Sequence, residues 1–167
     1  MNRDIRPIGR SLFAASVLIA FGCGGPELSG PPELRLGRDE CAECGMLIAE
    51  DRCAAALLAE IERRREHRIF DDLCCLFDYR AKHADETVIG AFARDYGAGG
   101  WIGAQTAAYV LSEPDRQPTP MASGMVAFAD PAAAAMRATE TGGRVLDYEA
   151  LAAARAAIRA SWRKSPR

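Results

Sequence analysis

The segment Cys41-Ala-Glu-Cys44-Gly-Met46 places two thiols and a thioether close together. Two cysteines at this spacing can form a disulfide, act as a redox pair, supply half of a zinc site or hold a softer metal. Cu(I) is a soft ion that prefers thiolate and thioether donors to imidazole or carboxylate. Gly45 allows the backbone to turn so that Met46 can approach the same ion. The donor types therefore favour a soft-metal site.

A further thioether, Met121, lies in the Pro-rich segment "PTPMASG", outside any periodic pattern. Binding residues concentrate in such loops. Core packing is the alternative for Met46 and Met121, and it is the role predicted for Met125 and Met136. The candidate metal ligands are Cys41, Cys44, Met46 and Met121.

The number of cysteines argues against a framework built only of disulfides. The chain has six cysteines, and five remain if Cys23 is modified. An odd number leaves at least one thiol free or bound to something else, so we favour metal ligation over a Cys41–Cys44 disulfide. A closed zinc site is poorly supplied, because there is no second Cys-x-x-Cys and the histidines, His67 and His83, lie in polar segments. A thioredoxin-like site would need a helix after the motif, where we expect a strand.

Other candidate groups surround a predicted helix in "DDLCCLFDYRAKH". Adjacent residues on a helix point about 100° apart, so Cys74 and Cys75 cannot both face one site. We predict that both are buried apolar thiols, like Cys53 between its alanines. Asp71 and Asp72 precede the helix and are predicted to cap it.

The N-terminus has the pattern of a secretory signal. Three arginines precede the apolar run 11–21, which is too short for the roughly 20 residues of a membrane-spanning helix. The Gly22-Cys23 pair that follows resembles the lipobox of bacterial lipoproteins, in which the cysteine is lipidated and becomes the mature N-terminus. Cleavage nearby with Cys23 left as a free thiol is the alternative. In either case the sequence predicts export from the cytoplasm.

Composition indicates an ordinary globular protein of one domain or two small ones. The chain has 167 residues, 49% of them hydrophobic, and a net charge of −2, so a nucleic acid is not an expected partner. Residues 23–38 are rich in Gly and Pro and read as a tether.

The elements that must position the thiols form an α+β pattern. Segments "RIFDDLCCLFDYR" and "VAFADPAAAAMRA" both run from a strand through Phe and Asp into a helix. We therefore predict two packed homologous ββαβ units. For residues 46–62 the sequence does not decide between a helix and a strand. We predict a hairpin tip at residues 63–67, a long strand at 101–113 and a closing strand at 144–151. The expected division is a signal peptide at 1–22, a lipidated N-terminus and tether at 23–38, a first unit with the metal motif at 39–97, a second unit at 98–150 and a helical tail at 151–167.

The order of these motifs resembles the NosL family, copper-binding lipoproteins of the outer membrane that assist nitrous oxide reductase maturation. The resemblance rests on "DECAECGMLIAED", "FDDLCCLFDY" and "YVLSEPDRQPTPMASGMVAFAD". It implies a fold of two ββαβ units akin to organomercurial lyase, and Cu(I) binding in which Cys41, Cys44, Met46 and Met121 take part. Cys75 matches a cysteine of the family, whereas Cys74 stands where glycine is expected.

The resemblance implies a Cu(I) chaperone in the periplasm, held to the outer membrane by its lipid and without enzymatic activity. Its partner would be nitrous oxide reductase, an assembly complex of that enzyme or another copper acceptor. Two alternatives stay open. One is an enzyme, either a dithiol oxidoreductase or a carbon–mercury lyase using Cys44, Cys75 and Asp72. The other is a structural lipoprotein with a Cys41–Cys44 disulfide.

Overall fold

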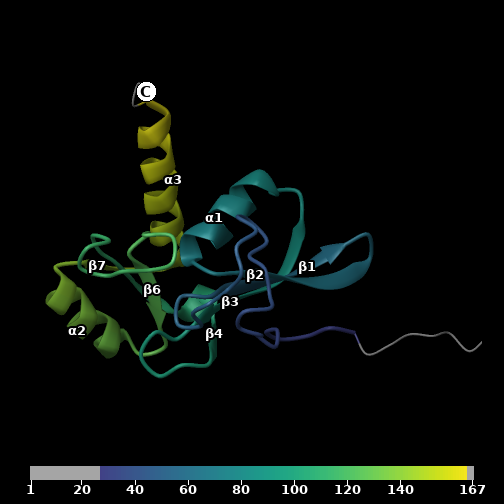
Figure 1. Ribbon diagram of the computed structural model, residues 1–167, viewed down its shortest axis with the longest axis horizontal. Coiled ribbons are helices and arrows are strands. Elements are labelled where there is room, and N and C mark those ends of the chain that lie inside the picture. Colours follow the sequence, from purple (N-terminus) through teal and green to yellow (C-terminus); the bar gives the residue numbers. More distant parts are fainter. Residues whose placement is uncertain (1–26, 165–167) are drawn as a thin grey trace, which may run out of the picture.

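The computed structural model describes residues 27–164, so the predicted signal segment and Cys23 lie outside the described residues. The elements, drawn in Figure 1, are β1 (Ala55–Ile61), β2 (Arg64–Phe70), α1 (Leu73–Lys82), β3 (Thr87–Arg94), β4 (Trp101–Gly103), the 3-10 turn η1 (Ala104–Thr106), β5 (Ala108–Leu111), β6 (Met125–Phe128), α2 (Pro131–Thr141), β7 (Arg144–Leu146) and α3 (Tyr148–Lys164). Within this range, no helix has the length and apolar character needed to cross a membrane.

Two antiparallel sheets repeat one topology. The first has the strand order β2-β1-β3-β4 and the second has the order β6-β5-β7. In both, a hairpin is followed by a helix, and the strand after the helix returns to the other side of the hairpin's first strand. The predicted α+β class and the pair of ββαβ units are confirmed.

Strand β1 lies in the segment 46–62, for which helix propensity and the hydrophobic pattern disagreed. It is the centre of its sheet, paired with β2 on one side and β3 on the other, and residues 55–59 are buried. Burial between neighbours therefore outweighs the helix preference of its alanines. The turn lies at Glu62 and Arg63, both with positive φ as in a type I′ hairpin turn, and β2 begins at Arg64. The predicted tip at 63–67 is thus too long.

Capping signals placed both repeat helices correctly. The Asp72 carboxylate accepts a hydrogen bond from the Cys74 N–H at the start of α1, and Asp130 does the same for Ala132 at the start of α2. Gly142 ends α2 in the left-handed conformation.

The long strand predicted over residues 101–113 is wrong. It is divided into β4, η1 and β5, and β4 pairs with β3 whereas β5 pairs with β6 and β7. The Tyr109 hydroxyl donates to the Ala104 carbonyl at 2.7 Å and holds the turn. The chain crosses here from one sheet to the other, which a continuous strand cannot do.

The closing strand is also shorter than predicted, because the last helix starts earlier. Strand β7 ends at Leu146, and the Asp147 carboxylate accepts from the Ala150 N–H at 2.8 Å. Asp147 therefore begins α3 where the hydrophobic pattern alone continued the strand.

A shared core joins the two sheets. One buried cluster includes Leu57 and Phe70 of the first unit together with Tyr109 and Met125 of the second. The Tyr96 N–H also donates to the Ala127 carbonyl at 2.8 Å, between the two units. The core roles predicted for Met125 and Cys53 are confirmed, whereas that of Met136 is wrong, since this residue is 66% exposed on α2.

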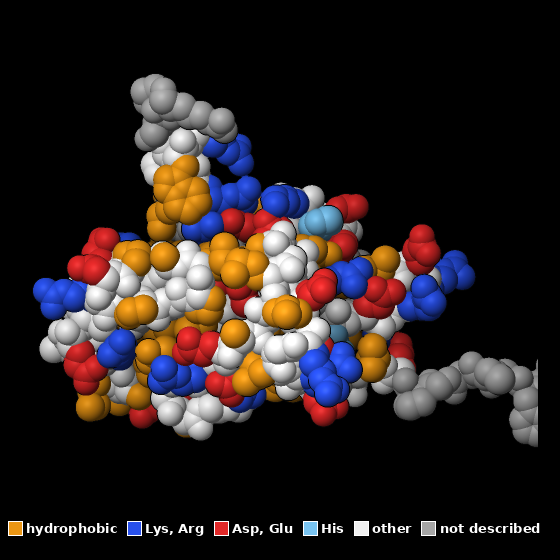
Figure 2. Space-filling view, in the orientation of Figure 1, with side chains coloured by type: hydrophobic (Ala, Val, Ile, Leu, Met, Phe, Trp, Pro, Cys, Tyr) orange, Lys and Arg blue, Asp and Glu red, His pale blue; other side chains and the backbone are white. Residues whose placement is uncertain are grey.

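Helix α3 packs on the core with its first half and then stands away from the body (Figure 1). Apolar and basic side chains are exposed along its projecting part (Figure 2), where Trp162 is 61% exposed. An ion pair fixes the base of the helix to α1. The Arg155 guanidinium donates to both oxygens of Asp78, at 2.8 and 2.6 Å, and the Arg155 side chain is buried.

Replacing Asp78 by Asn should lower the free energy of unfolding by about 2 kcal/mol, because the buried Arg155 keeps one acceptor but loses the opposite charge. Chemical denaturation measures this change. Glu140→Gln is the matched control, since its pair with Arg137 is exposed on the glutamate side and should contribute less than about 1 kcal/mol. Equal effects of the two substitutions would contradict the role of Asp78 in holding α3.

Candidate metal centre

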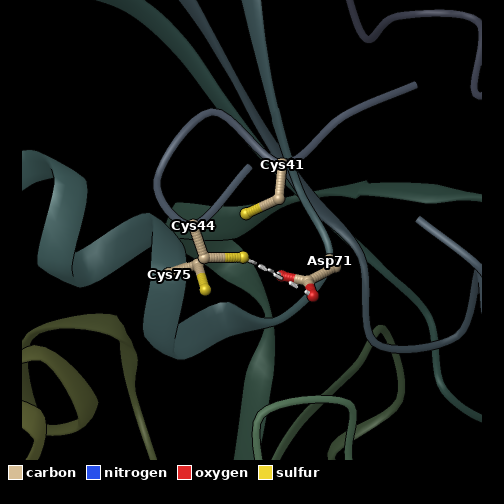
Figure 3. A group of neighbouring side chains, drawn as sticks. All are labelled: Cys41, Cys44, Asp71 and Cys75. Carbon is tan, nitrogen blue, oxygen red and sulfur yellow. Dashed lines mark hydrogen bonds between the residues drawn. The ribbon is translucent and has the colours of Figure 1, made fainter. Parts of the chain in front are cut away.

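Four side chains converge beside the N-terminus of α1. The sulfurs of Cys41, Cys44 and Cys75 and a carboxylate oxygen of Asp71 all lie within 4.8 Å of one another. Figure 3 shows the three sulfurs and the carboxylate directed toward a common space. The arrangement brings together residues up to 34 positions apart in the chain.

The Cys41–Met46 loop is held by its own backbone and by strand β2. The Cys41 N–H donates to the Met46 carbonyl at 2.8 Å, and Gly45 donates to the Cys41 carbonyl at the same distance. Gly45 has φ +74°, in the left-handed region that glycine adopts without a steric cost. The Ala42 N–H donates to the Ile69 carbonyl, which attaches the loop to the end of β2.

Asp71 and Cys75 come from the junction between β2 and α1. Phe70 ends the strand, Asp71 follows it, and Asp72 occupies the N-cap, so Cys75 falls in the first helical turn. Both Asp71 and Cys75 are buried. The partial positive charge of the helix N-terminus favours anionic groups at this position.

Hydrogen bonds favour the thiolate form of Cys41. The Cys75 S–H donates to the Cys41 sulfur and, with the backbone N–H groups of Asp71, Cys44 and Glu43, lowers the pKa of Cys41 to about 6 despite its burial. The same contact raises the pKa of Cys75, because this thiol must keep its proton in order to donate it. At neutral pH the cluster therefore holds one thiolate ready for a metal.

Cys44 is the exposed member of the cluster. Desolvation of its sulfur and the nearby negative charges of Cys41 and Asp71 raise the pKa of Cys44 to about 11. Its sulfur lies 3.8 and 3.9 Å from the two carboxylate oxygens of Asp71. A cation placed among these groups would offset their mutual repulsion.

The candidate methionines lie at the surface. Met46 is 53% exposed, next to the thiol loop, and Met121 is 38% exposed. The Met121 N–H donates to the Asp72 carboxylate at 3.1 Å, which attaches its loop to the start of α1. The second repeat unit therefore contributes a thioether-bearing loop next to the helix that carries Cys75.

The structure thus brings Cys41 and Cys44 together, and a ligand role for these two and for Met46 and Met121 stays a prediction. The predicted metal ligands did not include Asp71 or Cys75, although the lyase alternative had already placed Cys75 in one site with Cys44. Asp72 alone caps the helix, so the capping role predicted for Asp71 is wrong. The pair Asp71-Asp72 could have indicated this. Only the residue directly before a helix can be its N-cap, so the other aspartate is free for another role.

Burial predicted for the remaining cysteines is confirmed. Cys74 and Cys53 lie in the core, and every cysteine among residues 27–164 is a free thiol. Cys75 is buried as predicted, but it also faces the other two thiols of the cluster. Three thiols and one carboxylate form a donor set suited to thiophilic metal ions.

Comparisons with known proteins agree with this architecture. The sequence profile of the NosL family matches residues 35–156. No curated protein matched the sequence. Among solved structures, the crystal structure of the copper chaperone NosL from Shewanella denitrificans is similar, with a TM-score of 0.58 and 20% identity over 71% of this chain and 96% of that chain. The matched segment contains both repeat units and all four residues of the cluster, and the chain belongs to the NosL family.

Proposed function

We propose that this protein binds Cu(I) and passes it by ligand exchange to a copper-acceptor protein, without catalysing a reaction. The observation that carries the proposal is the convergence of three free thiols in one cluster, one of them exposed. Thiolate-rich sites select Cu(I). Membership in the NosL family and the fold shared with a copper chaperone support the same function.

The candidate copper donors differ in burial, in a way that suits transfer of the ion to a partner. Cys41 and Cys75 are buried, whereas Cys44, Met46 and Met121 are exposed. Cu(I) accepts few ligands, so a donor from a partner can bind the ion before the last donor of this chain leaves. The exposed donors would release the ion first, and the buried thiols would hold it until the partner has bound.

We further propose that transfer takes place in the periplasm. The NosL resemblance points to nitrous oxide reductase, at its copper–sulfide centre, or its assembly complex as the acceptor. A lipid on Cys23 would hold the chain at a membrane, and the outer membrane is the expected one. The Gly- and Pro-rich segment 23–38 would then separate the folded part from the lipid surface.

If the protein were a carbon–mercury lyase, its catalytic aspartate would have to be Asp71 rather than Asp72. The Asp72 carboxylate already accepts from the Cys74 and Met121 N–H groups and from the Ser123 hydroxyl. Asp71 would therefore have to supply the proton for cleavage of a carbon–mercury bond. Incubation with an organomercurial, followed by measurement of the hydrocarbon released, separates this activity from copper binding.

Anaerobic titration of the reduced, processed protein with Cu(I), in competition with a chromophoric Cu(I) chelator, tests the proposal. We expect about one copper per chain. The double variant Cys41→Ser/Cys44→Ser should bind more than about a hundredfold more weakly, because the loss of two ligands exceeds the effect of losing an outer-shell partner.

Cys53→Ala is the matched control, since Cys53 is buried in the core outside the cluster. It should lower stability slightly and leave the copper affinity unchanged. The proposal is wrong if the wild type does not compete with the chelator or if the double variant binds as tightly as the wild type.

A further inference from the structure

We propose that the groove between helix α3 and the Met121 loop (residues 119–124) is the docking site for the copper acceptor. It would take an acidic segment of that protein that carries one large apolar side chain. The inference rests on the proposed copper transfer, since it assigns the surface that the acceptor binds. It starts from the outer part of α3, which the rest of the fold leaves uncovered.

The outer part of α3, residues 156–164, has no buried side chain. One face of the helix carries, in order, Leu151, Arg155, Ile158 and Trp162. The first two are buried, whereas Trp162 is 61% exposed. The face that packs on the core therefore continues outward as an exposed apolar face. Helices owe most of their stability to the packing of such a face, which the described chain does not supply here.

This exposed face forms one wall of a groove of about 570 Å³, a size typical of ligand pockets. Ile158 and Trp162 line the groove from α3, and Leu111, Pro114 and Ala122 line it from the second repeat unit. A concave surface with apolar side chains from both sides fits an inserted side chain of a protein better than the flat face of a bilayer.

Trp162 is held in place although it is exposed. The Arg155 guanidinium lies over its ring, 4.8 Å from the ring centroid, and the same guanidinium donates to both oxygens of Asp78. The ion pair thus fixes the indole as well as the base of the helix. A tryptophan that is ordered before binding loses little freedom on binding, and tryptophan is enriched among the residues that dominate protein interfaces.

The α3 side of the groove is basic. Residues 156–164 contain three basic residues and no acidic one. Within the described part of the chain, no ion pair neutralises Arg163, Lys164 or Arg144, the last of which lines the groove. Glu113 is an acidic residue of the opposite wall, so positive charge is concentrated near α3. Charge complementarity therefore favours an acidic partner segment on this side.

The groove lies next to a candidate copper donor. Ser123 lines the groove, and its hydroxyl donates to the Asp72 carboxylate, which also accepts from the Met121 N–H. The Met121 side chain is 38% exposed. A segment bound in the groove would therefore bring the donors of the acceptor beside Met121.

The position of the N-terminal end argues against a membrane as the occupant. Glu27 pairs with Arg65 of β2 at 3.0 Å, and Figure 1 shows this end of the described chain far from α3. The chain from Cys23 to Glu27 spans at most about 14 Å even when fully extended. A lipid on Cys23 would thus hold the first unit, rather than α3, at the bilayer.

The test places the photocrosslinking amino acid p-benzoylphenylalanine at position 162 of the whole chain, in cells of its native host. The position is exposed and the new side chain is aromatic and similar in size, so the fold is retained. Irradiation should join the chain to one protein that has thiol, thioether or imidazole groups for copper, through a segment that contains Asp or Glu. The double variant Arg144→Glu/Arg163→Glu should lower the yield at least about tenfold.

The same label at Ile89, 41% exposed on β3, is the matched control and should give no such product. Equal yields from the two positions, no product from position 162, or a yield unchanged by the charge reversal overturns the proposal. So does a product of two copies of this chain, of this chain with a lipid, or with a protein that lacks groups for copper.

Trp162→Ala separates failure of docking from failure of copper binding. Its Cu(I) affinity and its transfer of copper to the small chelator should match the wild type, because neither requires the groove. Transfer to the crosslinked protein should slow at least about tenfold, and an unchanged rate overturns the docking site. A crosslink formed by a chain that does not bind Cu(I) would instead count against the copper proposal and leave the groove as a docking site.

Discussion

Replacing Gly124 by Ala is expected to abolish folding, or to lower the free energy of unfolding by more than about 4 kcal/mol. Gly124 has φ +65°, and a Cβ atom added there would lie 1.9 Å from the carbonyl oxygen of Ser112. That oxygen belongs to the backbone and cannot rotate away. The two segments are joined by a hydrogen bond from the Ser112 N–H to the Gly124 carbonyl at 3.0 Å, so relief of the clash breaks this contact.

Gly99→Ala separates the clash from the effect of backbone conformation. Gly99 has φ +76°, close to that of Gly124, but its added Cβ meets no atom within 4 Å. This control should therefore cost only the left-handed strain, about 1 to 2 kcal/mol. Urea denaturation, or the soluble yield where no folded protein is recovered, measures both variants. Similar losses at the two positions would show that the contact at Ser112 relaxes easily.

The sequence predicted those parts of the fold whose signals are local. Asp130, Pro131 and Gly142 carry the start and stop of α2 within one segment, and the similar order of strand, Phe, Asp and helix revealed the repeat. The break at residues 104–106 could not be predicted in this way. The break lies where the chain passes from the sheet of β4 to the sheet of β5, and that crossing is a property of the assembled fold rather than of the segment.

The metal cluster also combines residues that the local sequence reveals with residues that only the assembled fold brings together. Cys41 and Cys44 are visible as a motif because they share one loop. Asp71 and Cys75 join them only because Ala42 is hydrogen-bonded to the end of β2, a contact that spans 27 positions. Helical geometry allowed one of Cys74 and Cys75 to face a site, but it did not indicate which one. That choice depends on the side of α1 that the core covers, with Cys74 packed inward and Cys75 toward the loop.

Asp72→Ala should lower both stability and copper affinity, because this carboxylate joins the two repeat units beside the cluster. It accepts from the Cys74 N–H at 2.9 Å, the Met121 N–H at 3.1 Å and the Ser123 hydroxyl at 2.6 Å. Leaving these donors without an acceptor should cost about 4 kcal/mol of unfolding free energy. If Met121 binds Cu(I), release of its loop should also weaken copper binding by about tenfold, as for other groups that position a ligand.

Two variants distinguish positioning from a general loss of stability. Asp130→Ala removes the equivalent cap of α2, outside the metal cluster, and should cost about 1 kcal/mol without a change in copper affinity. Asp72→Asn keeps one oxygen for the Cys74 N–H but places an amide N–H₂ where the Met121 N–H needs an acceptor. It should regain much of the lost stability while copper binding stays weak, as denaturation and chelator competition on the same samples would show. Recovery of copper affinity in step with stability would mean that Asp72 acts through the fold alone and that the Met121 loop does not need this hydrogen bond.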